Sequence, residues 1–175
     1  MSDTRIPLGA LPLEGLELHL DDQTLWSGPL EEFGMDCRIT RPLAADIRIQ
    51  PLEDGYLVRG TISGDVTVPC NRCAEPMPVH LEERFEDFED TPSEDTACDG
   101  EGRIFMEKGA FYLDIAAIVW EQFVLALPPN PLCRTDCKGL CPECGANLNE
   151  GICACSHDEG DPRMAVLRGL KIARQ

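Results

Sequence analysis

The sequence predicts an α+β fold, with an antiparallel sheet or partial barrel, one main helix and a C-terminal cysteine-rich module. Three observations predict it. Polar and apolar residues alternate between residues 44 and 89, as they do in strands with one buried face. An apolar run at 113–127 has helical spacing, and eight of the ten cysteines form four close pairs, three of which follow residue 131. At 175 residues, the chain can form one hydrophobic core and a small additional module.

Residues 1–43 have the weakest pattern. Apolar residues fall at mostly even positions between Ile6 and Leu20, which indicates a half-buried strand or an extended arm. From residue 44 the pattern sharpens, since Ile47 and Ile49 alternate with polar residues. Residues 55–63 and 65–68 are predicted as two consecutive strands, and residues 78–89 alternate again. We therefore expect an antiparallel meander.

The stretch from Glu82 to Glu101 is strongly acidic. It holds ten acidic residues and a single base, Arg84, and is interrupted by Pro92 and Gly100. We interpret it as the end of a strand that runs into a solvated loop, because such charge runs are usually exposed to solvent. An acidic docking segment for a partner is the alternative.

Residues 113–127 are predicted as the main helix, packed on the sheet. Asp114 supplies a capping side chain, and Pro128 with Pro129 ends the helix. One face of this helix collects Ile115, Ile118, Val119, Gln122 and Phe123. A short amphipathic helix is predicted at 161–172. We therefore divide the chain into an α+β domain with an N-terminal arm (1–130), a metal-binding module (131–160) and a basic amphipathic helix (161–175).

The N-terminal sequence and the hydropathy favour a cytoplasmic protein without a membrane partner. Residues 1–22 lack a basic segment followed by an apolar run, and no stretch approaches the ~18 to 20 uninterrupted apolar residues of a membrane-spanning helix. In a reducing compartment, ten cysteines are better explained by metal ligation than by a disulfide framework.

Charge is distributed unevenly along the chain, whose formal net charge is −17. Four bases follow the last acidic residue, Asp161, so the rest of the chain holds 11 bases against 32 acids. A surface this acidic disfavours broad electrostatic binding of nucleic acid and favours a basic protein partner. The exception is the C-terminal tail, whose candidate partner-binding residues are Arg163, Arg168, Lys171 and Arg174.

The strongest motif is Cys141-Pro142-Glu143-Cys144-Gly145, followed by Cys153 and Cys155. In a Cys-x-x-Cys-Gly turn both thiolates converge on one ion, and glycine accepts the left-handed conformation that closes the turn. Two such pairs complete a tetrahedron of sulfur ligands with Zn–S distances of about 2.3 Å and no open position for water. We therefore predict a structural Zn²⁺ site formed by Cys141, Cys144, Cys153 and Cys155.

A second site follows from counting ligands. Cys70 and Cys73 leave the predicted hairpin, Cys133 and Cys137 follow the main helix, and each pair supplies half of a zinc site. Other groupings stay open. Cys133 or Cys137 can join Cys141 and Cys144, and His157 can replace a late cysteine. The neighbouring bases Arg72, Arg134 and Lys138 are suited to balancing the charge of the thiolates.

The remaining reactive residue types carry no prediction of a site. Cys37 and Cys98 lack partners at ligand spacing, and His19 and His80 lie in strand-like segments. Neither a glycine-rich phosphate loop nor a carboxylate with an ordered His or Lys partner is visible. We expect no catalytic residues, no enzymatic activity and no small-molecule substrate.

Three segments in combination resemble one known family. They are Cys70-Asn71-Arg72-Cys73, the stretch 125–133, and the stretch 137–149 together with Cys153 and Cys155. They resemble the YceD-like proteins, which support the accumulation of large-subunit ribosomal RNA, and Asp161-Pro162-Arg163 resembles that family's ending. The resemblance covers about residues 44–175 and implies a role in ribosome biogenesis without an assigned enzymatic activity.

The expected function is therefore that of a non-enzymatic zinc-binding factor for large ribosomal subunit assembly. Its partner is either a ribosomal protein of the large subunit, which the charge favours, or ribosomal RNA of that subunit, contacted through the tail and the region from Arg72 to Lys138. The alternative is a thiol-redox or zinc-transfer protein that uses exposed cysteine pairs. Gly145 after the Cys141–Cys144 pair weighs against that alternative, as does the lack of a thioredoxin-like strand–helix context.

Overall fold

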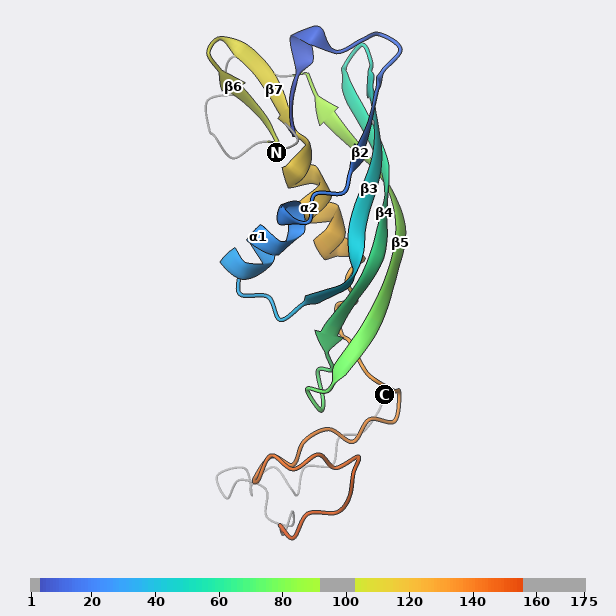
Figure 1. Cartoon of the computed structure of the whole chain (residues 1–175), viewed down its shortest axis with the longest axis vertical. Coiled ribbons are helices and arrows are strands. Elements are labelled where there is room, and N and C mark those ends of the chain that lie inside the picture. The colour runs from blue at the N-terminus through green and yellow to red at the C-terminus, as the bar shows by residue number, and fades with distance from the viewer. Residues whose placement is uncertain (1–3, 92–102, 156–175) are drawn as a thin grey trace, which may run out of the picture.

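A curved four-stranded antiparallel sheet forms the body of the protein (Figure 1). The computed structural model describes residues 4–91 and 103–155. The strand order is β2-β3-β4-β5, with β2 at Leu16–Leu20, β3 at Arg38–Pro51, β4 at Gly55–Pro69 and β5 at Pro76–Asp90. The predicted α+β class and the antiparallel meander are confirmed, with an open sheet rather than a barrel in the described residues.

A second, smaller antiparallel sheet was not predicted. Its order is β1-β7-β6, with β1 at Arg5–Pro7, β6 at Ile104–Glu107 and β7 at Ala110–Asp114, and a 3₁₀ helix, η1, at Leu8–Ala10. Lys108 and Gly109, with φ of 51° and 80°, form the tight turn between β6 and β7. Two consecutive residues with positive φ are typical of a type I′ hairpin turn.

The predicted main helix is α2, at Ile115–Ala126. Asp114 caps it, because its Oδ1 accepts a hydrogen bond of 3.2 Å from the backbone N–H of Ala117. The buried face of α2 packs against the inner face of the sheet. The residues of α2 on this face are Ile115, Ile118, Val119 and Phe123. The helix thus lies across the sheet, as the sequence predicts, and Leu127 leads into the prolines that follow (Figure 1).

Strand β4 corrects the prediction of two strands at 55–63 and 65–68, because Gly64 lies inside one continuous strand. Gly64 has a φ of 148°, and a Cβ atom there would lie 2.5 Å from Leu43 Cδ2 and 3.0 Å from Leu43 Cα. Glycine is therefore required by the close approach of β3, and it does not mark a turn.

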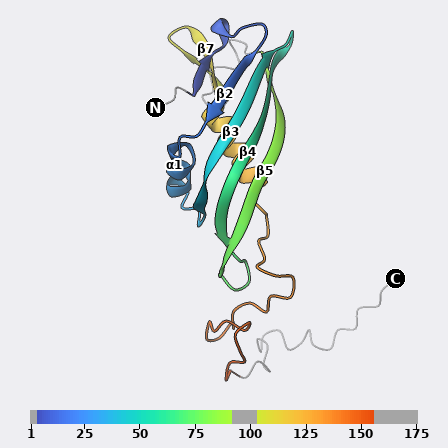
Figure 2. The ribbon, with the colours of Figure 1, turned by 45° about the vertical axis from the view of Figure 1, so that its right-hand side comes forward.

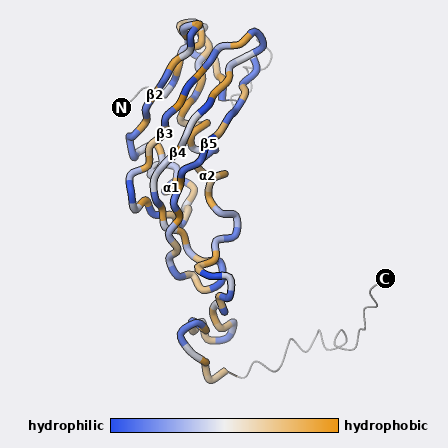
Figure 3. Tube along the Cα trace, turned by 90° about the vertical axis from the view of Figure 1, so that its right-hand side faces the viewer, coloured by the Kyte–Doolittle hydropathy of each residue, from blue (hydrophilic) through white to orange (hydrophobic). Residues whose placement is uncertain are grey.

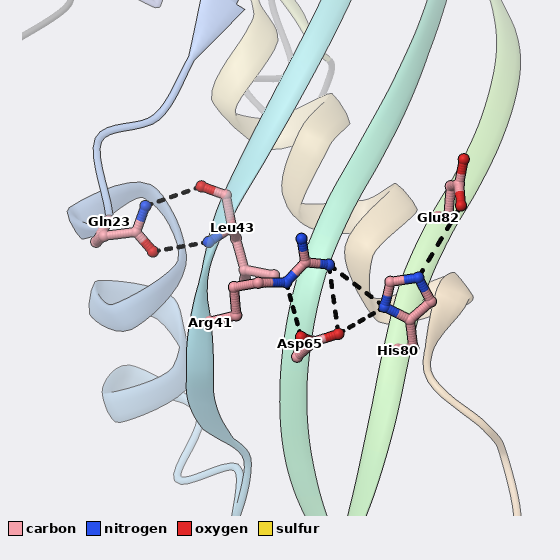
Figure 4. Close-up of polar contacts among 6 residues, drawn as sticks. All are labelled: Gln23, Arg41, Leu43, Asp65, His80 and Glu82. Carbon is pink, nitrogen blue, oxygen red and sulfur yellow. Dashed lines mark hydrogen bonds and ion pairs between the residues drawn. The ribbon is translucent and has the colours of Figure 1, made fainter.

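Helix α1, at Thr24–Glu32, lies in the weakly patterned segment 1–43 and was not predicted. Trp26 and Leu30 bury its inner face in the main core. The side chain of Gln23 holds it beside β3, because it donates to the carbonyl of Leu43 at 2.8 Å and accepts from the N–H of Leu43 at 3.0 Å (Figure 4). Strands β1 and β2 agree with the expectation for the rest of this segment.

The two faces of the large sheet differ in polarity, as the alternating colours along its strands show (Figure 3). The inner face carries Ile47, Ile62 and Val66, which are at most 3% exposed. The outer face carries Arg41, Asp65 and His80 on three adjacent strands; Asp65 accepts from Arg41 Nε at 2.7 Å and lies 2.6 Å from His80 Nδ1 (Figure 4).

None of the helices in the described residues is long and apolar enough to span a bilayer.

Strands β4 and β5 extend beyond α2 and carry their connecting turn, residues 70–75, away from the main core. Figure 2 shows this turn beside the chain that descends from α2. The length of the two strands therefore decides where the first pair of clustered cysteines lies.

Candidate metal centres

The first cysteine group joins the β4–β5 turn to the segment after α2. Cys70 and Cys73 belong to the turn, Cys133 and Cys137 follow the prolines at the end of α2, and the four Sγ atoms lie within 4.8 Å of one another. Cys70 Sγ is 3.9 Å from Cys137 Sγ, and Cys73 Sγ is 3.6 Å from Cys133 Sγ. Four sulfurs around an ion at about 2.3 Å are about 3.8 Å apart, so the arrangement fits a tetrahedral site.

Backbone hydrogen bonds hold the two segments together at this group. Asn71 N–H donates to the carbonyl of Pro131 at 2.8 Å, and Leu140 N–H donates to the carbonyl of Arg72 at 3.0 Å. The guanidinium of Arg72 donates to the carbonyl of Cys137 at 2.8 Å. Cys70, Cys73 and Cys137 are buried and form, with Leu132, a small apolar cluster that is separate from the main core.

The second group is local in sequence. Cys141, Cys144, Cys153 and Cys155 also place their Sγ atoms within 4.8 Å of one another. Cys141 is buried, Cys144 is exposed, and the other two are partly buried. Cys141 N–H donates to the carbonyl of Ala146 at 2.8 Å, which closes the turn that presents the first pair. This group is therefore more open to solvent than the first.

The two Cys-x-x-Cys turns close in the same way. The N–H of Ala74 donates to the carbonyl of Cys70 at 2.9 Å, and the N–H of Gly145 donates to the carbonyl of Cys141 at 2.9 Å. Gly145 has a φ of 73°, and Ala74 adopts the same left-handed conformation with a φ of 59°. This conformation costs an L-residue roughly 1–2 kcal/mol, so the contacts around the first turn must hold Ala74 in place.

Backbone donors stabilise one thiolate in each group. The N–H groups of Cys133, Cys73 and Arg72 lower the pKa of Cys70 to about 6. The N–H of Cys144 is the main cause that lowers the pKa of Cys141 to about 6, against the effect of burial. Loss of solvation around the sulfur, followed by hydrogen bonds with Cys73, Cys137 and Cys70 and by the charge of Cys137, raises the pKa of Cys133 to about 12. A bound cation stabilises all four thiolates together.

Asn149 lies between the two cysteine pairs of the second group in sequence and contacts a cysteine of the first group; it was not singled out by sequence reasoning. Its Nδ2 donates to Cys137 Sγ at 3.4 Å, and its Oδ1 accepts from the N–H of Lys138 at 2.8 Å. A donor that contacts a ligand sulfur fixes the orientation of that ligand. The sequence feature that could have identified Asn149 is the run Asn147-Leu148-Asn149 between the two cysteine pairs. In the structure, Asn149 Nδ2 also donates to Asn147 Oδ1 at 2.8 Å.

The structure thus brings together the eight cysteines in the two predicted groups, and it does not produce the grouping of Cys133 or Cys137 with Cys141 and Cys144. Binding of a metal by these residues stays a prediction. Cys37 lies in the main core. Outside the described residues lie Cys98, His157 and the predicted tail residues Arg163, Arg168, Lys171 and Arg174.

Comparisons with known proteins identify relatives of this chain. The model of the family described as "Large ribosomal RNA subunit accumulation protein YceD" matches residues 58–171, a span that includes both cysteine groups. An uncharacterised protein of Mycobacterium tuberculosis is 34% identical over 129 residues, which are 71% of this chain and 60% of that protein. This chain therefore spans about three fifths of the length of that relative.

Two plant relatives have a descriptive name, "Large ribosomal RNA subunit accumulation protein YCED homolog 1, chloroplastic". The protein from Zea mays is 25% identical over 179 residues, with 86% of this chain and 60% of that protein covered. The protein from Arabidopsis thaliana is 25% identical over 138 residues, with 64% of this chain and 43% of that protein covered. No solved structure matches.

Proposed function

The chain belongs to the YceD family, and from this membership we propose that it is a non-enzymatic, zinc-binding factor that supports the accumulation of large-subunit ribosomal RNA. It acts in the cytoplasm, by binding. The observation that carries the proposal is the family match over residues 58–171, which includes most of β4, all of β5, α2 and both cysteine groups. The partners of the protein, described below, are part of the same proposal.

Zinc suits both cysteine groups. Each offers four sulfur donors, and thiolates select Zn²⁺, Cu⁺ or iron–sulfur clusters over Mg²⁺ and Ca²⁺. The first group joins two chain segments that are about 60 residues apart in sequence. A tetrahedron closed by four cysteines has no position for a reacting water, so zinc here supports the fold instead of activating a substrate.

The partner is a component of the large ribosomal subunit. The net charge of −17 supports a basic ribosomal protein as the partner. Ribosomal RNA is the other candidate, contacted through Arg163, Arg168, Lys171 and Arg174. If RNA binds there, its affinity falls steeply with salt, and removal of any one base weakens binding to a similar extent.

A deletion strain tests the proposal. Loss of the protein is expected to lower the ratio of large to small ribosomal subunits, measured on sucrose gradients, and to lower large-subunit ribosomal RNA. Complementation with wild-type protein restores the ratio, whereas C70S and C144S do not, because each removes one ligand of a cysteine group. Cys37→Ala is the matched control, since Cys37 belongs to neither group.

The same experiment can overturn the proposal. A deletion strain with normal subunit ratios and normal ribosomal RNA, in rich medium and under stress, would return the chain to a zinc protein without an assigned process. Thiol-redox or zinc-transfer activity is the second candidate, because Cys144 is exposed and its group is open to solvent. It predicts fast alkylation of the zinc-loaded protein by iodoacetamide, whereas closed structural sites react slowly.

A further inference from the structure

Strand β5 is a long edge strand. It has 15 residues and, within residues 4–91 and 103–155, pairs only with β4 (Figures 1 and 2). Strands of globular proteins usually have about 5–6 residues, and edges are often kept shorter still, because a free edge presents unpaired N–H and C=O groups to other chains. An edge of this length is therefore a template for strand addition.

The pairing register identifies the backbone groups that face outward. At the two ends of the hairpin, Cys70 N–H donates to the carbonyl of Glu75, and Thr91 N–H donates to the carbonyl of Asp54. The register between these ends is continuous, and hydrogen-bonded pairs alternate in an antiparallel ladder. The odd-numbered residues of β5 therefore bond to β4, and the even-numbered residues direct their N–H and C=O groups away from the sheet.

Two prolines close one end of this edge. Pro76 and Pro78 occupy even positions and have no N–H, which is the placement that an edge strand tolerates. The open part of the edge therefore runs from His80 to Asp90. Its outward-facing groups belong to His80, Glu82, Arg84, Glu86, Phe88 and Asp90.

The open part of the edge is acidic. Glu82 and Glu86 have side chains that are 74% and 61% exposed on the outer face, where Glu82 lies next to His80 (Figure 4). Arg59 pairs with Glu86 at 2.6 Å, and Arg84 is the single Arg or Lys among residues 80–90, which hold six acidic residues. Pairing with a second copy of β5 would bring acids close to acids, which is unfavourable. The edge therefore suits a basic strand.

A small recess of mixed polarity, to which Glu83 and Gln122 also contribute, lies beside the inner side of the same edge. Its volume is about 130 Å³, and Phe85 of β5 and Leu125 of α2 contribute to its wall. Leu125 is 69% exposed although it is a large apolar side chain. A strand added along β5 would place every second side chain on this side, so apolar residues suit the positions beside Phe85 and Leu125.

We propose that the edge of β5 between His80 and Asp90 binds an extended basic segment of a partner protein by strand addition. Lysine or arginine side chains of that segment lie on the outer face beside Glu82 and Glu86, and alternate apolar side chains lie on the inner side beside Leu125. This inference rests on the proposed role in subunit assembly, for which it names a class of partner protein. The geometry of the β5 edge does not depend on that role.

A peptide of alternating lysine and valine, eight residues long and fluorescently labelled, is the probe. Fluorescence anisotropy with the full-length, zinc-loaded protein is expected to show binding. Two isomers carry N-methyl groups on all lysines or on all valines. Strand addition predicts that one isomer loses at least about tenfold in affinity and the other does not, because only one set of amides faces β5. Equal binding of the parent and both isomers, or no binding of the parent, overturns the proposal.

Substitutions at Glu82 provide the matched comparison on the protein. E82P removes the charge of Glu82 and one outward-facing N–H, and Pro78 shows that this strand accommodates proline at an even position. E82Q removes only the charge. The affinity for the peptide is expected to fall about tenfold more in E82P than in E82Q. Circular dichroism checks that both variants fold. If E82P does not fold, the N-methylated peptides alone test strand addition.

Two further outcomes assign the edge to another occupant. A dimer of the wild-type protein in sedimentation that dissociates in E82P would assign it to a second copy of the chain. Binding of a labelled single-stranded RNA that E82P weakens would assign it to RNA. Either result overturns the proposal. A failed peptide test beside a normal subunit-ratio defect in the deletion strain would leave the ribosomal role standing without this surface.

Discussion

At the scale of single residues, the pairing of the cysteines gives a direct prediction. Cys70→Ser and Cys133→Ser are expected to lose the same metal ion, and Cys144→Ser and Cys153→Ser the other, because each removes one of four sulfur ligands of a group. Purified wild-type protein should contain two zinc ions by elemental analysis, and each variant about one.

The control for this prediction is Cys37→Ser, which should retain both ions because Cys37 lies in the main core. A Cys70→Ser variant with unchanged zinc content would show that the first group is only a buried turn. Pairwise combinations sharpen the result: Cys70→Ser with Cys133→Ser should still retain one ion, while Cys70→Ser with Cys144→Ser should retain none.

The sequence predicted the grouping of the cysteines better than their surroundings. Each close pair supplies two ligands, so counting ligands was enough to join Cys70 with Cys133 across the chain. Nothing local in the sequence shows that Ala74 adopts a left-handed conformation, because alanine rarely does so. The contact of Asn149 with Cys137 Sγ was equally hidden, since it depends on where the chain returns after the second turn.

At the scale of elements, the N-cap of α2 gives a second prediction. Asp114→Ala removes the acceptor for the N–H of Ala117 and is expected to lower the free energy of unfolding by about 1 kcal/mol. For a chain of this size, that corresponds to about 2–4 °C in Tm. Thermal denaturation followed by circular dichroism measures it. Asp114→Asn is the control, because asparagine caps as well as aspartate; equal losses in both variants would contradict the capping role.

Helix α1 and the continuity of β4 were missed for the same reason, because both depend on tertiary contacts. Helix α1 contains Gly28 and Pro29, both of which normally argue against a helix, and tertiary packing of Trp26 outweighs that preference. Gly64 looked like a turn because its reason, the approach of Leu43, comes from a neighbouring strand. The long amphipathic patterns of β3, β5 and α2 were predictable because their period alone identifies the buried face.

At the scale of the whole molecule, the protein has two separate centres of stability. The main core lies between the large sheet and the two helices. It contains no cysteine of either cysteine group. Among residues 4–91 and 103–155, the small cluster around Cys70, Cys73 and Cys137 has only Leu132 as an apolar neighbour. So few apolar side chains offset little of the conformational entropy of the ordered segment, and we therefore expect metal ligation to supply most of its stability.

Removal of zinc is therefore expected to unfold the segment after Pro131 before the sheet. Binding of a structural zinc ion contributes about 10–16 kcal/mol in isolated zinc-finger peptides, and a chelator withdraws that contribution from both cysteine groups. Amide hydrogen exchange with and without chelator measures the effect. Residues 132–150 should become fast-exchanging, and the strands around Ile47 and Ile62 should remain protected, because their packing involves no cysteine ligand. Unchanged protection after Pro131, with zinc shown to be fully removed, would mean that the hydrogen bonds of Arg72 and Asn71 hold that segment without metal.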